Sequence, residues 1–197
     1  MKSSSGESTA RLVGNALLVA LVIVLQIVSS NVRFGPFTIT LTLIPVVIGG
    51  ILYGAGSGAM LGAIFGAMVT FFSIIGVEGG GNIMFQYNPI LTVLTCMLKG
   101  TAAGLIPAWV YPLIARKNKS VAAVVSAMLA PVCNTGIFLF FALVFFRPVM
   151  EAWASGLSMV IYVITGLVGV NFLVEFAVST VLSPVVVTVT KVIRSTK

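Results

Sequence analysis

The sequence predicts an all-α membrane protein with six transmembrane helices in one bundle. Hydrophobic residues make up 59% of the chain and charged residues only 8%, whereas a soluble domain carries about 25% charged residues. Six apolar runs, most of them near the ~20 residues that cross a bilayer, fill almost the whole length. Turn-forming or charged segments separate these runs. We therefore expect a single integral membrane domain over residues 1–197.

The first three spans are joined by short connections. The run at about 11–30 exceeds the apolar core of a signal peptide and lacks a following Ala-x-Ala site, so we interpret it as a retained span. The second span, at about 37–53, contains Pro45, which should kink the helix or leave its start irregular. The uncharged connector GAGSG permits only a tight hairpin into the third span, at about 57–77.

The second half of the chain repeats this alternation. Three consecutive glycines within 78–88 favour a mobile loop. The fourth and fifth spans follow at about 89–114 and 121–146, with the basic turn RKNK between them. The sixth span, at about 157–183, is expected to end where Pro184 breaks the helix.

The distribution of basic residues predicts the orientation. Six spans place both termini on one side, and that side carries eight lysines and arginines outside the spans: Lys2, Arg11, Arg116, Lys117, Lys119, Lys191, Arg194 and Lys197. The opposite side carries two, Arg33 and Arg147. By the positive-inside rule both termini are cytoplasmic and the 78–88 loop faces outward. The net charge of +7 therefore reflects orientation in a lipid bilayer, and no nucleic-acid partner is predicted.

Missing residue types and motifs exclude several functions. The chain has no histidine and no aspartate, which removes histidine bases, histidine metal sites and aspartate-containing triads. No phosphate-binding loop is present, so the chain does not itself hydrolyse ATP. Cys96 and Cys133 lie in apolar runs without metal-like spacing and are expected to be reduced, buried side chains. We predict neither an enzyme nor a metal or cofactor site on this chain.

Polar residues recur on one face of the fourth span. Asn88, Thr92, Thr95 and Lys99 are spaced four, three and four residues apart and share a helical face. Lys99 lies ten residues beyond Pro89, or roughly 15 Å deep at ~1.5 Å per residue. That depth is about half of a ~30 Å hydrocarbon core. Because a lysine there is costly unless paired or solvated, this face must point inward.

Further polar groups occur at comparable depth in the last two spans. Asn134 lies in the fifth span, and Asn171 and Glu175 lie one turn apart in the sixth. With Lys99 they predict a site for a small ligand that bears a carboxylate, hydroxyls or amides. The alternative is a non-transport scaffold or assembly protein, in which Lys99 and Glu175 form a structural pair and the asparagines join helices.

Two further groups have two interpretations each. Aromatic and polar residues of the outward loops form either an ordinary interfacial belt or a lid over a ligand, hinged at the glycines around Gly80: Phe34, Phe37, Phe85, Gln86 and Tyr87. Glycines recur every four residues from Gly50 to Gly66 and predict close helix packing. Ala16 and Ala20, in a span otherwise rich in Leu, Val and Ile, serve either such packing or docking of another membrane protein.

Three segments, in this order, carry a family resemblance: ITLTLIPVVIGGILYGAGSGAMLGAIFGAM, the fourth span beginning NP and containing LKG, and LAPVCNTGIFL. The chain resembles the substrate-binding S components of energy-coupling factor (ECF) vitamin transporters, in the riboflavin- and pantothenate-type branch. The resemblance implies a six-helix subunit that binds a water-soluble vitamin from outside. It also implies a location in a bacterial cell membrane and docking on a transmembrane T subunit, driven by two ABC-type ATPases that use the ATP.

The resemblance also suggests roles for particular segments. It assigns Ala16 and Ala20 to contact with the T subunit, and the loops at 31–37 and 78–88 to gating. Lys99 favours a vitamin with a carboxylate, so we expect pantothenate, with riboflavin or another vitamin as the alternative.

Overall fold

The computed structural model describes residues 4–31, 33–34, 37–38 and 40–195, with side-chain surroundings for 9–31, 40–166 and 172–192. In chain order the elements are α1 (Ser4–Ser29), β1 (Arg33–Phe34), β2 (Phe37–Thr38), α2 (Leu43–Tyr53), α3 (Ala55–Ile74), α4 (Gly79–Tyr87), α5 (Pro89–Ala115), α6 (Lys119–Phe145), α7 (Arg147–Ala154), α8 (Met159–Tyr162), the π-helical segment η1 (Val163–Phe172) and α9 (Leu173–Ser195). The strands form a small antiparallel hairpin, in which Arg33 pairs with Thr38 and Phe34 with Phe37.

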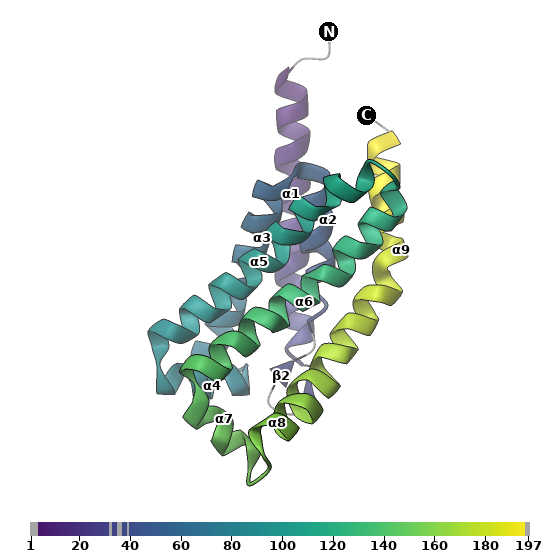
Figure 1. Cartoon of the computed structure of the whole chain (residues 1–197). Helices are drawn as coiled ribbons and strands as arrows, with labels where there is room; N and C mark the ends of the chain where they lie inside the picture. The colour runs from purple at the N-terminus through teal and green to yellow at the C-terminus, as the bar shows by residue number, and fades with distance from the viewer. Residues whose placement is uncertain (1–3, 32, 35–36, 39, 196–197) are drawn as a thin grey trace.

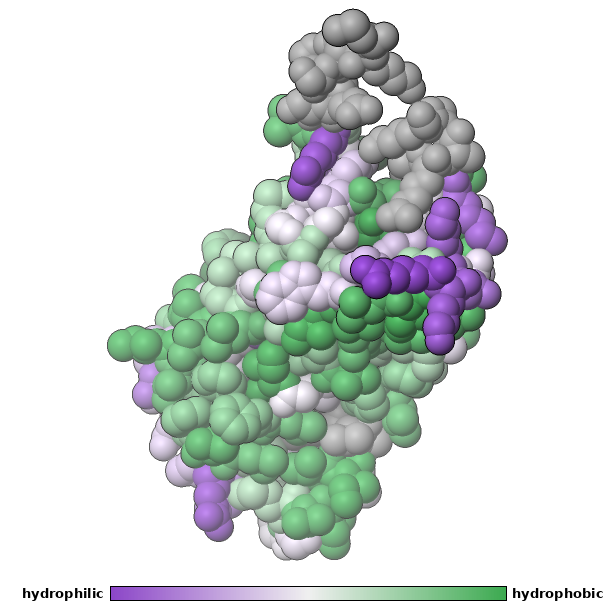
Figure 2. Space-filling view, turned by 45° about the horizontal axis from the view of Figure 1, so that its top comes forward, coloured by the Kyte–Doolittle hydropathy of each residue, from purple (hydrophilic) through white to green (hydrophobic). Residues whose placement is uncertain are grey.

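The predicted all-α membrane fold is confirmed. Within the described residues, five helices are long and apolar enough to cross a membrane: α1, α3, α5, α6 and α9. A sixth candidate is the pair formed by α7 and the segment Met159–Gly166, bent by 83°. The start of α1 and the end of α9 lie at the same end of the molecule (Figure 1). A broad hydrophobic surface separates hydrophilic residues at the two ends (Figure 2).

The second predicted span, 37–53, begins too early, and the 11-residue helix found there is shorter than the ~20 residues that cross a bilayer. Its first residues form β2, and helix α2 starts only at Leu43. Pro45 lies in the first turn of α2, where a missing N–H breaks no helical hydrogen bond. The preceding backbone bonds to another helix instead, since the Leu41 N–H donates to Ser29 Oγ at 3.3 Å.

The predicted mobile loop at 78–88 is also wrong, because its glycines form helix α4. Asn82 Nδ2 donates to the Ser73 carbonyl at 2.8 Å and ties α4 to the end of α3. Met84 is 2% exposed and packs against Phe146 and Val149. These tertiary contacts outweigh the low helix propensity of glycine.

Pro184 does not end the last helix, contrary to prediction, and α9 continues to Ser195. A proline leaves the carbonyl four residues earlier, here that of Thr180, without its helical donor. Ser183 Oγ donates to this carbonyl at 2.7 Å and replaces the lost bond.

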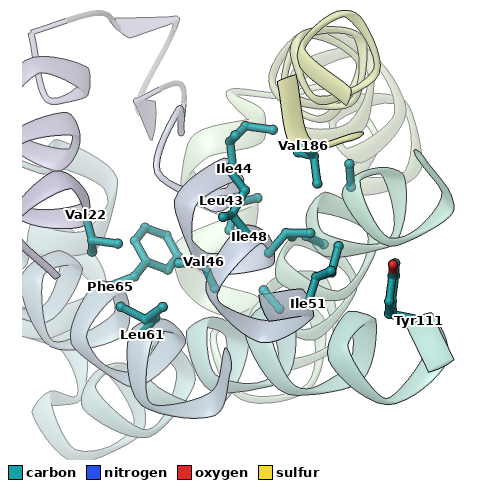
Figure 3. Packing of buried hydrophobic residues seen from close by; sticks show 14 of the residues in the cluster. Val22, Leu43, Ile44, Val46, Ile48, Ile51, Leu61, Phe65, Tyr111 and Val186 are labelled. Carbon is teal, nitrogen blue, oxygen red and sulfur yellow. The ribbon is translucent and has the colours of Figure 1, made fainter. Parts of the chain in front are cut away.

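Helix α2 occupies the centre of the bundle. It is buried from Leu43 to Ile51, on every side, which is typical of a core helix and not of a surface one. Its side chains pack against Phe65 of α3, Val22 of α1 and Val186 of α9 (Figure 3).

The small residues of α3 and α5 bring the two backbones into contact. Gly58 lies against Gly104, Gly62 against Gly100, and Gly66 against the Cys96 backbone. A Cβ on any of these three α3 glycines would meet a carbonyl of α5. The predicted role of this glycine series in internal packing is therefore confirmed for Gly50, Gly58, Gly62 and Gly66, whereas a Cβ on Gly54 would meet nothing within 4 Å.

Gly62→Ala should push α3 and α5 apart. Overpacking of this kind destabilises by about 1–3 kcal/mol, and we expect a drop in the thermal unfolding midpoint of roughly 2–12 °C. Gly56→Ala is the matched control, because a Cβ on Gly56 of the same helix meets nothing within 4 Å. Thermal unfolding of the two detergent-purified variants measures their midpoints. Equal midpoints would contradict the close contact between α3 and α5 at Gly62.

Candidate functional site

The polar face of α5 points into the bundle, as its spacing predicts. Thr92 and Thr95 are each 1% exposed. Their hydroxyls donate to the carbonyls of Asn88 and Leu91, at 2.9 and 2.7 Å. Asn88 Oδ1 accepts the Leu91 N–H at 3.0 Å and caps the start of α5.

A small cavity of about 30 Å³ lies beneath α4. Helices α3, α4, α5 and α6 form its walls, with these lining residues: Val69, Ser73, Glu78, Gly81, Met84, Thr92, Thr95, Cys96, Lys99 and Phe138. Pockets for small ligands are typically ~300–1,000 Å³. In this structure the cavity is therefore smaller than a typical small-ligand pocket.

Lys99 is the cation of this cavity. Its Nζ lies 5.5 Å from the centroid of the Phe138 ring, within the range of a cation–π contact. Arg147 and Glu151 form an ion pair at the surface, at 3.0 Å, and within the described part of the chain no such pair joins Lys99 to Glu175. Lys99 acts on the Glu175 carboxylate only over a longer distance.

Glu78 is a cavity residue that the sequence pattern does not reveal. The spacing of apolar residues places Glu78 in an outer loop. The same pattern predicts that only Lys99 and Glu175 are charges inside the bundle. In the structure Glu78 is 6% exposed and lines the same cavity as Lys99. The available signal was its place directly after an apolar run; the folding of the next three glycines back over it is not visible in the sequence.

Glu175 holds the segment that leads from the hairpin into α2. It is 2% exposed, and its Oε1 accepts the Thr40 N–H at 3.1 Å. Two residues further, Thr42 Oγ1 donates to Gln26 Oε1 of α1 at 2.8 Å. Segment 40–42 is thus attached to both α1 and α9.

Two buried oxygens near this attachment have no hydrogen-bond donor. Asn134 is 5% exposed, and its side chain interacts with the Glu175 carboxylate. Asn134 Oδ1 and Glu175 Oε2 are both buried and unpartnered. An unsatisfied buried acceptor costs about 1–3 kcal/mol, so a ligand group that donates hydrogen bonds would be favoured here.

The other predicted site residues lie at varied places. Asn171 falls in η1, and Phe34 and Phe37 in the hairpin, but these side chains lie outside the described residues. On α4, Gly80 is buried and Phe85 half-buried. Gln86 donates to Asn82 Oδ1 at 2.8 Å on the surface, and Tyr87, 50% exposed, packs on the ring of Phe146. Gly81 and Met84, not these aromatic residues, cover the cavity from α4.

Ala16 and Ala20 lie on an uncovered face of α1. Both are exposed, and Leu12 beside them is 72% exposed. Only 17% of the apolar stretch of α1 is buried, compared with 56% of the apolar stretch of α3. This face of α1 is therefore available to lipid or to another membrane protein.

Comparison with known proteins identifies the family. The model of the family "ECF transporter, substrate-specific component" matches residues 10–187. The chain belongs to this family. It is a multi-pass membrane protein that binds a substrate for transport and is not an enzyme, and S components of this kind pair with T and ATPase modules. Membership of this family argues against the alternative of a non-transport scaffold or assembly protein.

A similar protein has an assigned substrate. The chain is 25% identical over 199 residues to the pantothenic acid transporter PanT of Lactococcus lactis subsp. cremoris (strain MG1363), with 95% of each protein covered.

The hydrogen bond from Thr40 to Glu175 should contribute measurably to stability. Glu175→Gln and Glu175→Leu both remove the charge, but only Gln keeps an acceptor for the Thr40 N–H. We expect the Leu variant to be less stable than the Gln variant by about 1–3 kcal/mol, in thermal unfolding without ligand. Glu151→Gln, at an exposed ion pair, should change little. Equal midpoints for the two Glu175 variants would argue against this bond as the stabilising contact.

Proposed function

We propose that this S component captures pantothenate from outside the cell and delivers it to a T-subunit and ATPase module. The observation that carries the proposal is one cation, Lys99, near two buried acceptors without donors, Asn134 Oδ1 and Glu175 Oε2. The relative named as a pantothenic acid transporter supports the same substrate.

The chemistry of pantothenate complements these groups. Its carboxylate would form a charge-assisted hydrogen bond with Lys99. Its hydroxyls and amide N–H are donors for the oxygens of Asn134 and Glu175, which do not line the cavity but lie close enough for Lys99 to act on Glu175. A flavin would instead need a flat aromatic slot, and Trp109 of α5 is 60% exposed and cannot contribute one.

Entry of the ligand requires the outer end to open. Helix α4 covers the cavity through Gly81 and Met84, and segment 40–42 lies across the neighbouring polar groups. A turn precedes α4, with Gly76 at a φ of 80°, a conformation that glycine adopts easily. We propose that α4 moves about this turn to admit the ligand.

The proposed orientation directs this opening to the outside of the cell. Eight lysines and arginines belong to the end that carries the termini, and two belong to the opposite end. Both termini are accordingly cytoplasmic, and the hairpin and α4 face outward.

Lys99→Met should weaken pantothenate binding by about 10–150-fold, because a hydrogen bond to a charged group contributes ~1.5–3 kcal/mol. Isothermal titration of the purified S component measures the Kd, with Lys119→Met, an exposed lysine, as the control. An unchanged Kd would exclude Lys99 from the site. Tighter binding of riboflavin than of pantothenate by the unmutated protein would reject the substrate assignment.

Ala16→Trp should abolish pantothenate uptake but leave the Kd of the isolated S component unchanged. A large ring on this exposed face prevents the close helix approach that small residues permit. Val181→Trp on α9 is the control, since Val181 is 74% exposed to lipid but lies on another helix. Uptake by reconstituted complexes and co-purification with the T subunit are the measurements. Normal uptake by the Ala16→Trp variant would rule out docking through this face.

A further inference from the structure

A second, larger hollow lies on the membrane-facing side of the bundle. It is a groove of about 380 Å³ between α1, α2 and α9. Leu18 and Leu21 of α1, Ile48 of α2, and Val185 and Val189 of α9 are among the residues that line it. None of its lining residues is charged, and Tyr53 at one end carries the one hydroxyl among them.

The length of the groove matches one leaflet of a bilayer. Along α1 it extends from Gly14 to Leu25, a separation of 25 − 14 = 11 residues. At ~1.5 Å per residue this is roughly 16 Å, about half of a ~30 Å hydrocarbon core. The end at Gly14 and Tyr53 is the end that carries the chain termini.

A cation lies at that end of the groove. Arg11 precedes Gly14 by three residues and Leu18 by seven, so it shares their face of α1. Its Nη2 donates to the carbonyl of Tyr53 at 2.7 Å, which holds the guanidinium beside the groove. Arg11 is exposed, and a guanidinium has further N–H donors suited to a phosphate.

The groove borders the proposed docking face without including its alanines. Ala16 and Ala20 do not line it. Each is two residues from Leu18, or ~200° around α1, whereas Leu17, which does line the groove, is three residues and about 60° from Ala20.

We infer that this groove binds one acyl chain of an anionic phospholipid, whose phosphate is held by Arg11. The chain lies along α1 in the leaflet on the side of the termini. The apolar walls, the one-leaflet length and the cation at the headgroup level together favour a lipid over a protein helix as the occupant.

Native mass spectrometry of the purified S component tests this inference. The probes are phosphatidylglycerol and phosphatidylcholine with identical acyl chains, supplied in equal amounts. We expect one phosphatidylglycerol to be retained about fivefold better than phosphatidylcholine, since a single basic residue near an anionic headgroup has an effect of this order. Equal retention of the two lipids by the unmutated protein would overturn the inference.

The headgroup contact is tested at Arg11. Arg11→Gln should abolish the preference for phosphatidylglycerol, and Arg11→Lys should keep most of it because the charge remains. Arg116→Gln, an exposed arginine in the turn after α5, is the matched control and should have no effect. Loss of the preference in the Arg116 variant to the same extent would indicate general surface charge and overturn the assignment to Arg11.

The acyl site is tested by filling the groove. Leu21→Trp, at a side chain that is 42% exposed, should reduce retention of both lipids at least severalfold. Val24→Trp is the control on the same helix, since Val24 is 55% exposed and does not line the groove. If Leu21→Trp leaves lipid retention unchanged but blocks assembly with the T subunit, or abolishes a dimer of this chain, a protein occupies the groove and the inference fails. Neither result bears on the Kd for pantothenate.

Discussion

The contact between the backbones of α3 and α5 positions almost everything else in this protein. Helices in lipid gain little from excluding water, so their association depends on close van der Waals approach. Gly62 against Gly100 provides that approach. It also sets the rotation of α5, so that Thr95 and Lys99 line a cavity with the end of α3. The core helix α2 then packs between α3 and α9 (Figure 3).

Some buried polar groups hold segment 40–42, and others lie near the candidate site. The bonds from Thr42 to Gln26 and from Leu41 to Ser29 attach segment 40–42 to α1. Glu175 takes part in both tasks, because Oε1 accepts from Thr40 while Oε2 is unpartnered. A ligand donor at Oε2 would share one carboxylate with the segment above it. Ligand binding and the position of segment 40–42 would then be linked through a single side chain.

Sequence reasoning succeeded where local spacing decides the outcome and failed where distant contacts do. The four-three-four spacing around Lys99 required an inward face, and Thr92 and Thr95 are buried as expected. The glycines at 79–81 predicted a loop. The bond from Asn82 to the end of α3 and the packing of the Met84 side chain stabilise this segment as a helix. Helix α9 continues past Pro184, where the Ser183 hydroxyl bonds to the Thr180 carbonyl, a contact that no propensity scale contains.

Composition and periodicity were sufficient for the membrane class, the helical fold, the glycine packing and the inward direction of Lys99, because each follows from the solvent and from positions a few residues apart. They did not reveal that Glu78 lies in the cavity, that Glu175 bonds to Thr40, or that Lys99 and Glu175 form no direct ion pair. These facts join residues from different helices. Their distances follow from how the helices pack and rotate against one another, which no short stretch of the chain encodes alone.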